Sequence, residues 1–560
     1  MEIYKRFFDI TEDAQGRLRE IQVINDEEFN FAYDVVDAIA EKDPEKMCML
    51  WTDPERKQKR FTFGQMRDRS IQAANYFLDL GIRRGDHVML ILRRHSQFWT
   101  AILALHRIGA VVIPATHQLR KEDLSYRFEK GDIRAVVCTD HMPTCLQADA
   151  AVKERIEGGA DPIIKIMTGE ALPGWHAFDE EVTGYPEEME RVPAGGKDPM
   201  LMFFTSGTTG YPKIVTHDFR YPLGHFVTAK YWQGVDPEGI HFTLSDTGWG
   251  KALWGKLYGQ WLCEAAVFVY DMESLNPNEF LTLFDDYPIT TFCAPATAYR
   301  IFAKMDLSGC GICRLQRATT AGEALSPEIW KQFYEKTGLP IMEGFGQTET
   351  TLTVGTLTGT EPKPGSMGKP SPFYHVQLVD EDGGPVAQGE PGEVVVRVGE
   401  EPPRGLFSGY YGGTGNREDV LYNGLYHTGD LAREDEDGYY WYVGRNDDLI
   451  KSTGYRVGPA EVESIIMELP QILECGVIGV PDPQRGQRVM AFVVPTEKTR
   501  QEVEQGELDL RAVKAQVMKH CKKRMANYKC PRKIEILEEL PKTISGKIRR
   551  PALRQMAGVD

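Results

Sequence analysis

A loop of small, hydroxyl-bearing and glycine residues that ends on a lysine is the part of this sequence best suited to chemistry. The loop reads Thr205-Ser206-Gly207-Thr208-Thr209-Gly210-Tyr211-Pro212-Lys213 and follows an apolar run, residues 201–204, of strand length. Such a loop brings backbone N–H groups, hydroxyl donors and one positive charge together, which suits a polyphosphate. A Walker A loop is excluded, because that pattern needs Gly directly before Lys and here Pro212 precedes Lys213. Taken alone, the loop is also compatible with a plain surface turn.

Four further segments of the C-terminal half group polar and charged residues closely. Taken singly, each has an ordinary explanation: Phe345 as a core aromatic, Asp430 as a turn cap, and the lysines after residue 540 as a solvated basic tail. Their occurrence in one chain, in order after the glycine-rich loop, favours a common function. The segments are Glu343-Gly344-Phe345-Gly346-Gln347-Thr348-Glu349, Tyr426-His427-Thr428-Gly429-Asp430, Gly444-Arg445-Asn446-Asp447-Asp448-Leu449-Ile450-Lys451-Ser452-Thr453-Gly454-Tyr455-Arg456 and Leu540-Pro541-Lys542-Thr543-Ile544-Ser545-Gly546-Lys547-Ile548-Arg549-Arg550.

Together, the loop over residues 206–213 and these segments resemble the AMP-forming acyl-CoA synthetases, over nearly the whole chain. The resemblance is greatest to the medium-chain, butyrate-type branch of a superfamily that also holds luciferases and peptide-synthetase adenylation domains. It implies that ATP, with Mg²⁺, activates a small-to-medium carboxylic acid, straight or branched, as an acyl-AMP with release of pyrophosphate. The acyl group then passes to CoA, and no covalent nucleophile of the enzyme takes part.

The resemblance also assigns the nucleotide contacts. Thr348 would bond the α-phosphate, Glu349 would hold Mg²⁺, and Lys213 would offset the charge of the triphosphate. Phe345 and the pair Gly322-Glu323 would lie on opposite faces of the adenine. Asp430 would accept both ribose hydroxyls, with Arg445 beside it. The complete set implied for ATP is Thr205, Ser206, Gly207, Thr208, Thr209, Gly210, Gly322, Glu323, Glu343, Phe345, Gly346, Thr348, Asp430, Arg445, Arg456 and Lys547.

The C-terminal motifs resemble the moving parts of that family. A carboxylate that attacks a phosphate meets charge repulsion, and a cation that bridges both groups lowers this barrier. Lys547 matches the lysine with this part, and Asp447 matches the hinge between two catalytic poses. Arg456 would meet an ATP phosphate in one pose. The residues implied for CoA are Thr453, Gly454, Tyr455 and Arg485.

Gly346 is the most informative residue for the acid. In acetate-specific relatives this motif position holds a tryptophan that closes the acyl pocket, so glycine should admit a longer or branched chain. Trp249 and Trp254 are candidates for a second wall that would favour small branched or medium acids. Core packing is the equally ordinary explanation of both tryptophans.

Apolar strands alternate with amphipathic helices along most of the chain. Residues 87–92 and 135–138 have strand length, and residues 98–108 have apolar positions at helical spacing. Fully apolar strands separated by such helices predict parallel sheets covered on both faces. Residues 376–398 predict a small β subdomain of hairpin-linked strands, and residues 1–60 a helical lead-in. The predicted fold class is therefore α/β, with a large N-terminal domain of parallel-rich sheets.

The pattern resets near residue 446. A helix that begins at Pro459, strands over 474–480, 489–494 and 533–537, and a charged helix over 507–527 predict a small α+β domain of about a hundred residues, enough for its own core. We therefore expect an adenylate-forming domain over 1–446 and a mobile domain over 447–560 that carries Lys547.

Composition limits the partners. The 560 residues are too many for one core, and a net charge of −17 argues against a nucleic acid or an anionic membrane. No apolar run approaches the ~20 residues of a membrane helix. The ten cysteines sit mostly in apolar surroundings and suggest reduced thiols. Acidic residues near the start, such as Glu2, Asp9 and Glu12, are unlike a mitochondrial presequence. We therefore expect a cytoplasmic protein, and a homodimer is compatible with the sequence.

Two other functions stay open at this point. One is a stand-alone adenylating enzyme that acts on an aryl acid or passes its acyl group to a carrier-protein thiol. A CoA-dependence assay separates this case. The other is a nucleotide-binding regulator without turnover, which has little need for Lys547. Pyrophosphate release across a panel of acids separates that one.

Overall fold

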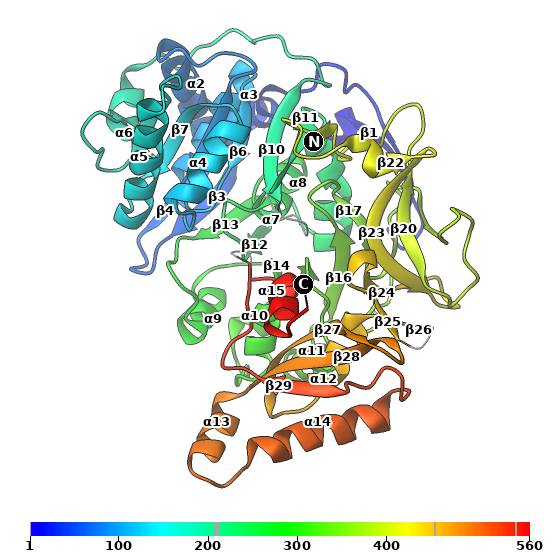
Figure 1. The fold of residues 1–560 in the computed structure, drawn as a ribbon. Helices are drawn as coiled ribbons and strands as arrows, with labels where there is room; N and C mark the ends of the chain where they lie inside the picture. Colours follow the sequence, from blue (N-terminus) through cyan, green and yellow to red (C-terminus); the bar gives the residue numbers. More distant parts are fainter. Residues whose placement is uncertain (1, 206–211, 453–454, 544–545, 560) are drawn as a thin grey trace.

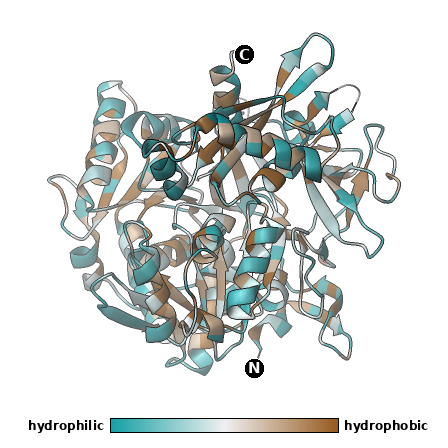
Figure 2. Ribbon diagram, turned by 90° about the horizontal axis from the view of Figure 1, so that it is seen from below, coloured by the Kyte–Doolittle hydropathy of each residue, from teal (hydrophilic) through white to brown (hydrophobic). Residues whose placement is uncertain are grey.

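The computed structural model describes residues 2–205, 212–452, 455–543 and 546–559. Two large sheets with their helices form the upper and middle part of the view in Figure 1, an antiparallel β subdomain lies beside them, and residues 455–536 lie below, whereas the C-terminus itself lies near the middle. Figure 2 shows apolar residues mainly on the enclosed strands and hydrophilic residues on the outward faces of helices. The α/β fold class is thereby confirmed.

The first sheet has eight strands and is covered on both faces. Its order is β21 (Gly409–Tyr410), β11 (Lys213–Asp218), β10 (Pro199–Thr205), β6 (Val111–Pro114), β5 (His87–Ile91), β7 (Ile133–Thr139), β8 (Ile164–Thr168) and β9 (His176–Ala177). From β10 to β9 the pairs are parallel. Val88 and Leu90 pack with α2 (Phe63–Asp79) and α3 (Gln97–Ile108), while Met89 and Ile91 pack with α4 (Lys121–Lys130) and α5 (Met142–Glu157). This alternation follows from the two-residue period of a strand.

The second sheet has nine strands. Its order is β18 (Lys369–Pro370), β17 (Leu352–Gly355), β16 (Ile341–Gly346), β15 (Arg317–Ala321), β14 (Thr291–Ala294), β12 (Ile240–Thr243), β13 (Ala266–Tyr270), β3 (Met47–Thr52) and β4 (Gln58–Thr62). The pairs from β16 to β3 are parallel, and both edges are antiparallel. One face packs against α9 (Pro277–Asp286), α10 (Ala296–Phe302) and α11 (Pro327–Thr337).

The other face of the second sheet shares a core with the first. Val267 and Val269 of β13 belong to the same buried cluster as Val88 and Leu90 of β5. Helices α2 and α3, together with α7 (Gly250–Gly255) and α8 (Tyr258–Leu262), supply the side chains between them. The two sheets are thus fixed relative to each other by one continuous core.

The β subdomain and the C-terminal part each have a five-stranded sheet. The first contains β19 (Val376–Val379), β20 (Gly392–Arg397), β23 (Leu425–Glu434), β22 (Leu421–Tyr422) and β24 (Tyr440–Arg445), all antiparallel. The second contains β26 (Tyr455–Val457), β25 (Ile450–Ser452), β28 (Gly486–Pro495), β27 (Ile472–Asp482) and β29 (Lys533–Ile536). Helices α12 (Pro459–Ile466) and α14 (Leu510–Arg524) pack on one face of this sheet and α15 (Arg550–Met556) on the other. The remaining helices are α1 (Ala38–Lys42), α6 (Phe178–Glu181) and α13 (Glu497–Glu504).

The helical lead-in predicted for residues 1–60 is confirmed mainly over residues 32–42 and is wrong for most of the rest. The structure has a hairpin of β1 (Phe8–Glu12) and β2 (Leu18–Val23), and strands β3 and β4 form one edge of the nine-stranded sheet. Strand β3 pairs in parallel with β13, which lies more than two hundred residues later in the chain. Its short apolar run was missed, because a partner that distant leaves no local periodicity. Among the described residues, no helix has the length and apolar character needed to cross a bilayer.

Candidate functional site

The predicted phosphate and metal residues meet at the carboxyl ends of parallel strands from both sheets. Strand β10 of the first sheet ends at Thr205, which pairs with Lys213 at the start of β11. Strand β16 of the second sheet ends at Gly346, just before Thr348 and Glu349. Open α/β sheets gather their ligands at such ends. The predicted residues Ser206, Gly207, Thr208, Thr209, Gly210, Thr453 and Gly454 lie outside the described residues.

A tyrosine links the loop lysine to the predicted metal carboxylate. The Lys213 Nζ lies 4.9 Å from the centre of the Tyr410 ring, and the Tyr410 hydroxyl donates to Glu349 Oε1 at 3.1 Å. Burial raises the pKa of the Glu349 carboxyl, whereas the hydrogen bond from Tyr410 and the charges of Arg445 and Lys213 lower it. Glu349 therefore sits in a cationic surrounding suited to phosphate.

The donor set fits Mg²⁺ that arrives with its nucleotide. Within the described part of the chain, no group of three or more His, Cys, Asp or Glu side chains is arranged to hold a metal ion. Mg²⁺ usually binds through one or two carboxylates, substrate phosphates and water rather than in an all-protein cage. The single, half-buried carboxylate of Glu349 meets that description.

His217, which the sequence analysis missed, fixes the backbone at Thr348. Its ring Nε2 hydrogen-bonds to the Thr348 carbonyl oxygen at 2.7 Å, across the gap between β11 and the β16 motif. Burial lowers the pKa of His217 to about 4, so the imidazole is neutral at physiological pH and Nε2 must carry the proton. Only the pairing of β11 with β10 brings this histidine to the site, and no spacing in the sequence predicts it.

The predicted ribose residues are registered partners on neighbouring strands. Asp430 of β23 stands opposite Arg445 of β24. Gln347 Nε2 donates to Asp430 Oδ2 at 2.5 Å, and the Tyr442 hydroxyl donates to Oδ1 at 3.0 Å. Burial raises the pKa of Asp430, and the charges of Arg445 and Lys547 oppose that effect. Both oxygens of the Asp430 carboxylate therefore accept a hydrogen bond from another protein side chain.

Lys547 lies near this group and Arg456 does not. The charge of Lys547 reaches both Asp430 and Lys251: burial lowers the pKa of Lys251, Glu323 raises it, and Lys547 lowers it further. The backbone at Lys547 is held in a local turn, because the Lys547 N–H donates to Thr543 Oγ1 at 3.1 Å. Arg456 instead pairs with Glu381 of the β19–β20 turn at 2.5 Å. Of these two predicted cations, the structure brings only Lys547 to the nucleotide residues.

Open space borders the predicted adenine loop. Gly322 has a φ of +96°, and a Cβ built there would meet nothing within 4 Å. Glu343 supports this loop, because its carboxyl accepts hydrogen bonds from the backbone N–H of Leu325 at 3.3 Å and of Gly365 at 3.0 Å. The Phe345 ring lies 6.3 Å from that of Tyr442. The geometry leaves room for a flat ring beside Gly322.

The buried carboxyl of Glu343 predicts a pH-dependent stability. Burial raises its pKa from an ordinary 4.5 to about 8. Between these values the folded state binds more protons than the unfolded state, so the free energy of unfolding falls as the pH rises, by at most roughly 1.4 kcal/mol per pH unit. The variant Glu343→Gln should lack this fall, so its stability relative to wild type should increase from pH 5 to pH 8. Urea unfolding without nucleotide measures the difference, and parallel curves for the two proteins would contradict the assignment.

Position 346 has no space for a side chain. A Cβ built on Gly346 would lie 2.5 Å from the Trp254 ring and still closer to the Thr351 carbonyl oxygen. Trp254 is 8% exposed and lies on α7. Trp249 stands at the beginning of the same helix, after a turn in which Asp246 accepts the Gly248 N–H at 2.9 Å. Of the two tryptophans, Trp254 therefore stands beside Gly346.

The predicted hinge residue and the described CoA residues lie in or just before the small C-terminal sheet. Asp447 forms an ion pair with Arg445 at 3.5 Å, and its carbonyl oxygen accepts from Arg554 of α15 at 3.5 Å. The exposed ring of Tyr455 stacks on Tyr528, with centres 4.2 Å apart. Arg485 lies in the turn between β27 and β28.

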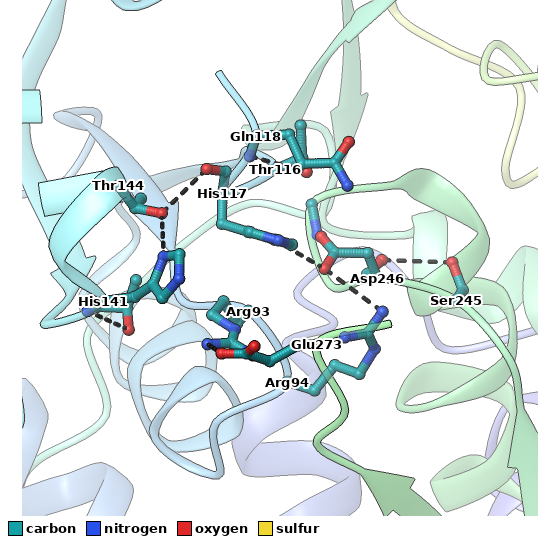
Figure 3. A network of polar contacts seen from close by, with 12 residues as sticks. Arg93, Arg94, Thr116, His117, Gln118, His141, Thr144, Ser245, Asp246 and Glu273 are labelled. Atoms are coloured by element: carbon teal, nitrogen blue, oxygen red, sulfur yellow. Dashed lines mark hydrogen bonds and ion pairs between the residues drawn. The ribbon is translucent and has the colours of Figure 1, made fainter. Parts of the chain in front are cut away.

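A network of charged and polar side chains around Arg93 and Arg94 was also missed by the sequence analysis (Figure 3). An oxygen of the Asp246 carboxylate lies 3.3 Å from His117 Nδ1 and 3.9 Å from an Arg94 nitrogen. Arg93 has a φ of +48° and reaches Glu273 at 3.6 Å. The Nε atoms of Arg93 and Arg94 are buried without a hydrogen-bond partner. Asp271 also lies 4.0 Å from Arg93, so the carboxylates of Asp246, Asp271 and Glu273 surround the two guanidinium groups. Arg93, Arg94 and His117 each come shortly after a predicted strand, and this position is the signal in the sequence that could have indicated the network.

Curated proteins similar to this chain include two acyl-coenzyme A synthetases. The chain is 37% identical to the mitochondrial acyl-coenzyme A synthetase ACSM3 of Mus musculus and 36% identical to that of Homo sapiens, in each case over 94% of this chain and 90% of the relative. The names of both relatives place them in mitochondria, and the cytoplasmic location predicted above is therefore wrong. One of the acidic residues behind that prediction has a structural contact: Glu12, on β1, accepts a hydrogen bond from the hydroxyl of Tyr231.

Family models and a solved structure agree with these relatives. The model of the AMP-binding enzymes matches residues 36–411, and that of the AMP-binding enzyme C-terminal domain matches residues 461–547. An anthranilate CoA ligase solved with anthranoyl-AMP is similar in fold, with a TM-score of 0.84 and 27% identity over 96% of this chain and 98% of that one. The site geometry, the relatives and the fold together show that the chain belongs to the AMP-binding enzymes, and within them to the acyl-coenzyme A synthetases.

Proposed function

We propose that this acyl-CoA synthetase joins a small-to-medium carboxylic acid, straight or branched, to CoA through an acyl-AMP. The observation that supports the proposal most is the convergence of residues from distant segments: Lys213 and Glu349 both contact Tyr410, and the charge of Lys547 reaches Asp430. A nucleotide triphosphate needs cations at its phosphates and a carboxylate at its ribose. Mg²⁺ held by Glu349 supplies charge neutralisation at the phosphates.

In the first step, the carboxylate of the acid attacks the α-phosphorus of ATP, the bond to pyrophosphate breaks, and acyl-AMP forms. Thr348, with its backbone held by His217, orients the attacked group, and Asp430 holds the ribose. Lys547 stabilises the charge that develops between carboxylate and phosphate. The electrostatic influence of Lys547 on Asp430 and Lys251 supports this role.

In the second step, the thiol of CoA attacks the acyl carbon and AMP leaves. We propose that the domain over 447–560 pivots at Asp447, which removes Lys547 and brings residues 453–455 to the site. Such domain rotations act through a few residues that absorb the change in backbone torsion.

The identity of the acid follows from the wall beside Gly346. Trp254 lies next to this glycine, and we infer that this residue of α7, rather than the motif itself, closes the acyl pocket. We infer a pocket deeper than one for acetate but shorter than one for long-chain acids. Similarity to the anthranilate ligase keeps aryl acids as the alternative.

A substrate panel tests this proposal. Isotope exchange between pyrophosphate and ATP should be fastest with butyrate, isobutyrate or 2-methylbutyrate and slower by about tenfold or more with acetate, palmitate and benzoate, because one methylene group changes binding in a hydrophobic pocket by about 1–3 kcal/mol. Release of AMP in excess of the enzyme should require CoA. Highest exchange with benzoate would favour the aryl alternative, and turnover that needs an added carrier protein instead of CoA would contradict the thioester step.

Location and assembly are separate parts of the proposal. The names of the curated relatives support a mitochondrial location for this chain. A homodimer stays a prediction.

A further inference from the structure

Three residues of the ribose motif leave the ladder between β20 and β23. Glu393 pairs with Leu431, and the next pair joins Val395 to His427. Thr428, Gly429 and Asp430 therefore stand opposite the single residue Val394. A bulge of this kind bends the strand and re-aims its side chains. The position of the Asp430 carboxylate thus depends on whatever fixes the bulge.

One tie within the bulge comes from Thr428. Its hydroxyl donates to the Val394 carbonyl oxygen at 2.7 Å, and the Thr428 Oγ1 itself accepts the Asp430 N–H at 3.1 Å. Gly429, between them, has a φ of +70°, a left-handed conformation that glycine adopts without steric cost. Because glycine is equally free to adopt other torsions, a further contact is needed to hold this one.

Glu393 supplies that contact. Its Oε1 accepts the Gly429 N–H at 2.9 Å, and its Oε2 lies 2.9 Å from the Nδ1 of His427. The two side chains are only 17% and 10% exposed. The Tyr422 ring covers His427 in a parallel stack, with centres 3.8 Å apart. A carboxylate enclosed in this way forms charge-assisted hydrogen bonds, which are shorter and stronger than neutral ones.

We propose that Glu393 is a positioning residue that orients Asp430 for the ribose of the nucleotide. Gln347 and Tyr442 hold the tip of the Asp430 side chain, whereas Glu393 holds the backbone turn from which that side chain leaves. The inference rests on the proposed role of Asp430 in binding the ribose hydroxyls. It adds a residue from a different strand, which acts through Gly429.

Nucleotide analogues separate positioning from general stability. Pyrophosphate exchange is measured with ATP, 2′-deoxy-ATP and 3′-deoxy-ATP for wild type, Glu393→Ala, Glu393→Gln and Asp430→Ala. For Glu393→Ala we expect the KM for ATP to rise about tenfold, which equals about 1.4 kcal/mol. The KM for the deoxy nucleotides should change little, so that the preference for ATP disappears. Glu393→Gln should keep part of that preference, since its carbonyl oxygen can still accept from Gly429.

Arg397→Ala, at the exposed end of the same strand, is the matched control and should keep the preference for ATP. If Glu393→Ala does not fold, Glu393→Asp decides, because its shorter side chain keeps the charge but cannot reach Gly429. A wild-type preference in the folded Glu393 variants, with that preference lost in Asp430→Ala, would overturn the role of Glu393 alone. Absence of any preference in the wild type would instead overturn the proposed ribose contact of Asp430.

Discussion

The variant Lys547→Ala is expected to lose acyl-AMP formation by roughly a hundredfold or more, while thioester formation from supplied acyl-AMP and CoA continues. Removal of one group that stabilises developing charge typically costs 10²–10³ in rate. In the structure, Lys547 is near enough to Asp430 and Lys251 for its charge to shift the pKa of both, and burial is the larger cause in each case. Pyrophosphate exchange measures the first half-reaction, and release of AMP from synthetic acyl-AMP measures the second.

Lys542→Ala is the matched control for this variant. Lys542 lies in the same C-terminal segment but pairs with Glu474 of β27 at 2.7 Å, within the small sheet. Its loss should leave both half-reactions near the wild-type rate. Equal losses of adenylation in Lys542→Ala and Lys547→Ala would indicate that the C-terminal segment has a structural role and that Lys547 has no chemical one. Wild-type adenylation by Lys547→Ala would remove the catalytic part assigned to this lysine.

The variant Trp254→Ala is expected to shift the preferred acid toward longer chains. A Cβ at Gly346 would already meet the indole of Trp254, so this ring is the wall that the motif itself lacks. Its removal should raise kcat/KM for octanoate relative to butyrate by about tenfold or more, because each methylene group accommodated in an apolar pocket is worth about 1–3 kcal/mol. The same truncation leaves a cavity and should lower the free energy of unfolding by about 3–5 kcal/mol.

Trp249→Ala separates the pocket wall from the helix that carries it. Both tryptophans belong to the α7 segment, but only Trp254 stands beside position 346. Trp249→Ala should therefore change the ratio of octanoate to butyrate much less. Competition assays with both acids in one reaction measure this ratio without dependence on the amount of folded enzyme. A ratio unchanged in Trp254→Ala would place the end of the pocket elsewhere.

Local structure was largely determined by the sequence itself. The apolar runs predict β5, β7 and β28, and the helical spacing of residues 98–108 predicts α3 within a residue at its N-terminal end. These elements succeed because their residues are buried on regular faces, and burial leaves a period of two or about 3.6 in the sequence. The motifs that carry the family resemblance are likewise continuous stretches of chain, and the comparisons confirm the family that they indicate.

Contacts between distant segments were decided only by the tertiary structure. The sequence alone does not show that Trp254 lies against Gly346. It also does not show that His217 hydrogen-bonds to the Thr348 backbone or that Glu393 accepts the Gly429 N–H. The edge strands β3 and β4 were missed for the same reason, since β3 pairs with a strand far along the chain. Local periodicity records which face of an element is buried, whereas the identity of the neighbour across that face depends on strand order. Strand order in turn results from the packing of both sheets around one shared core.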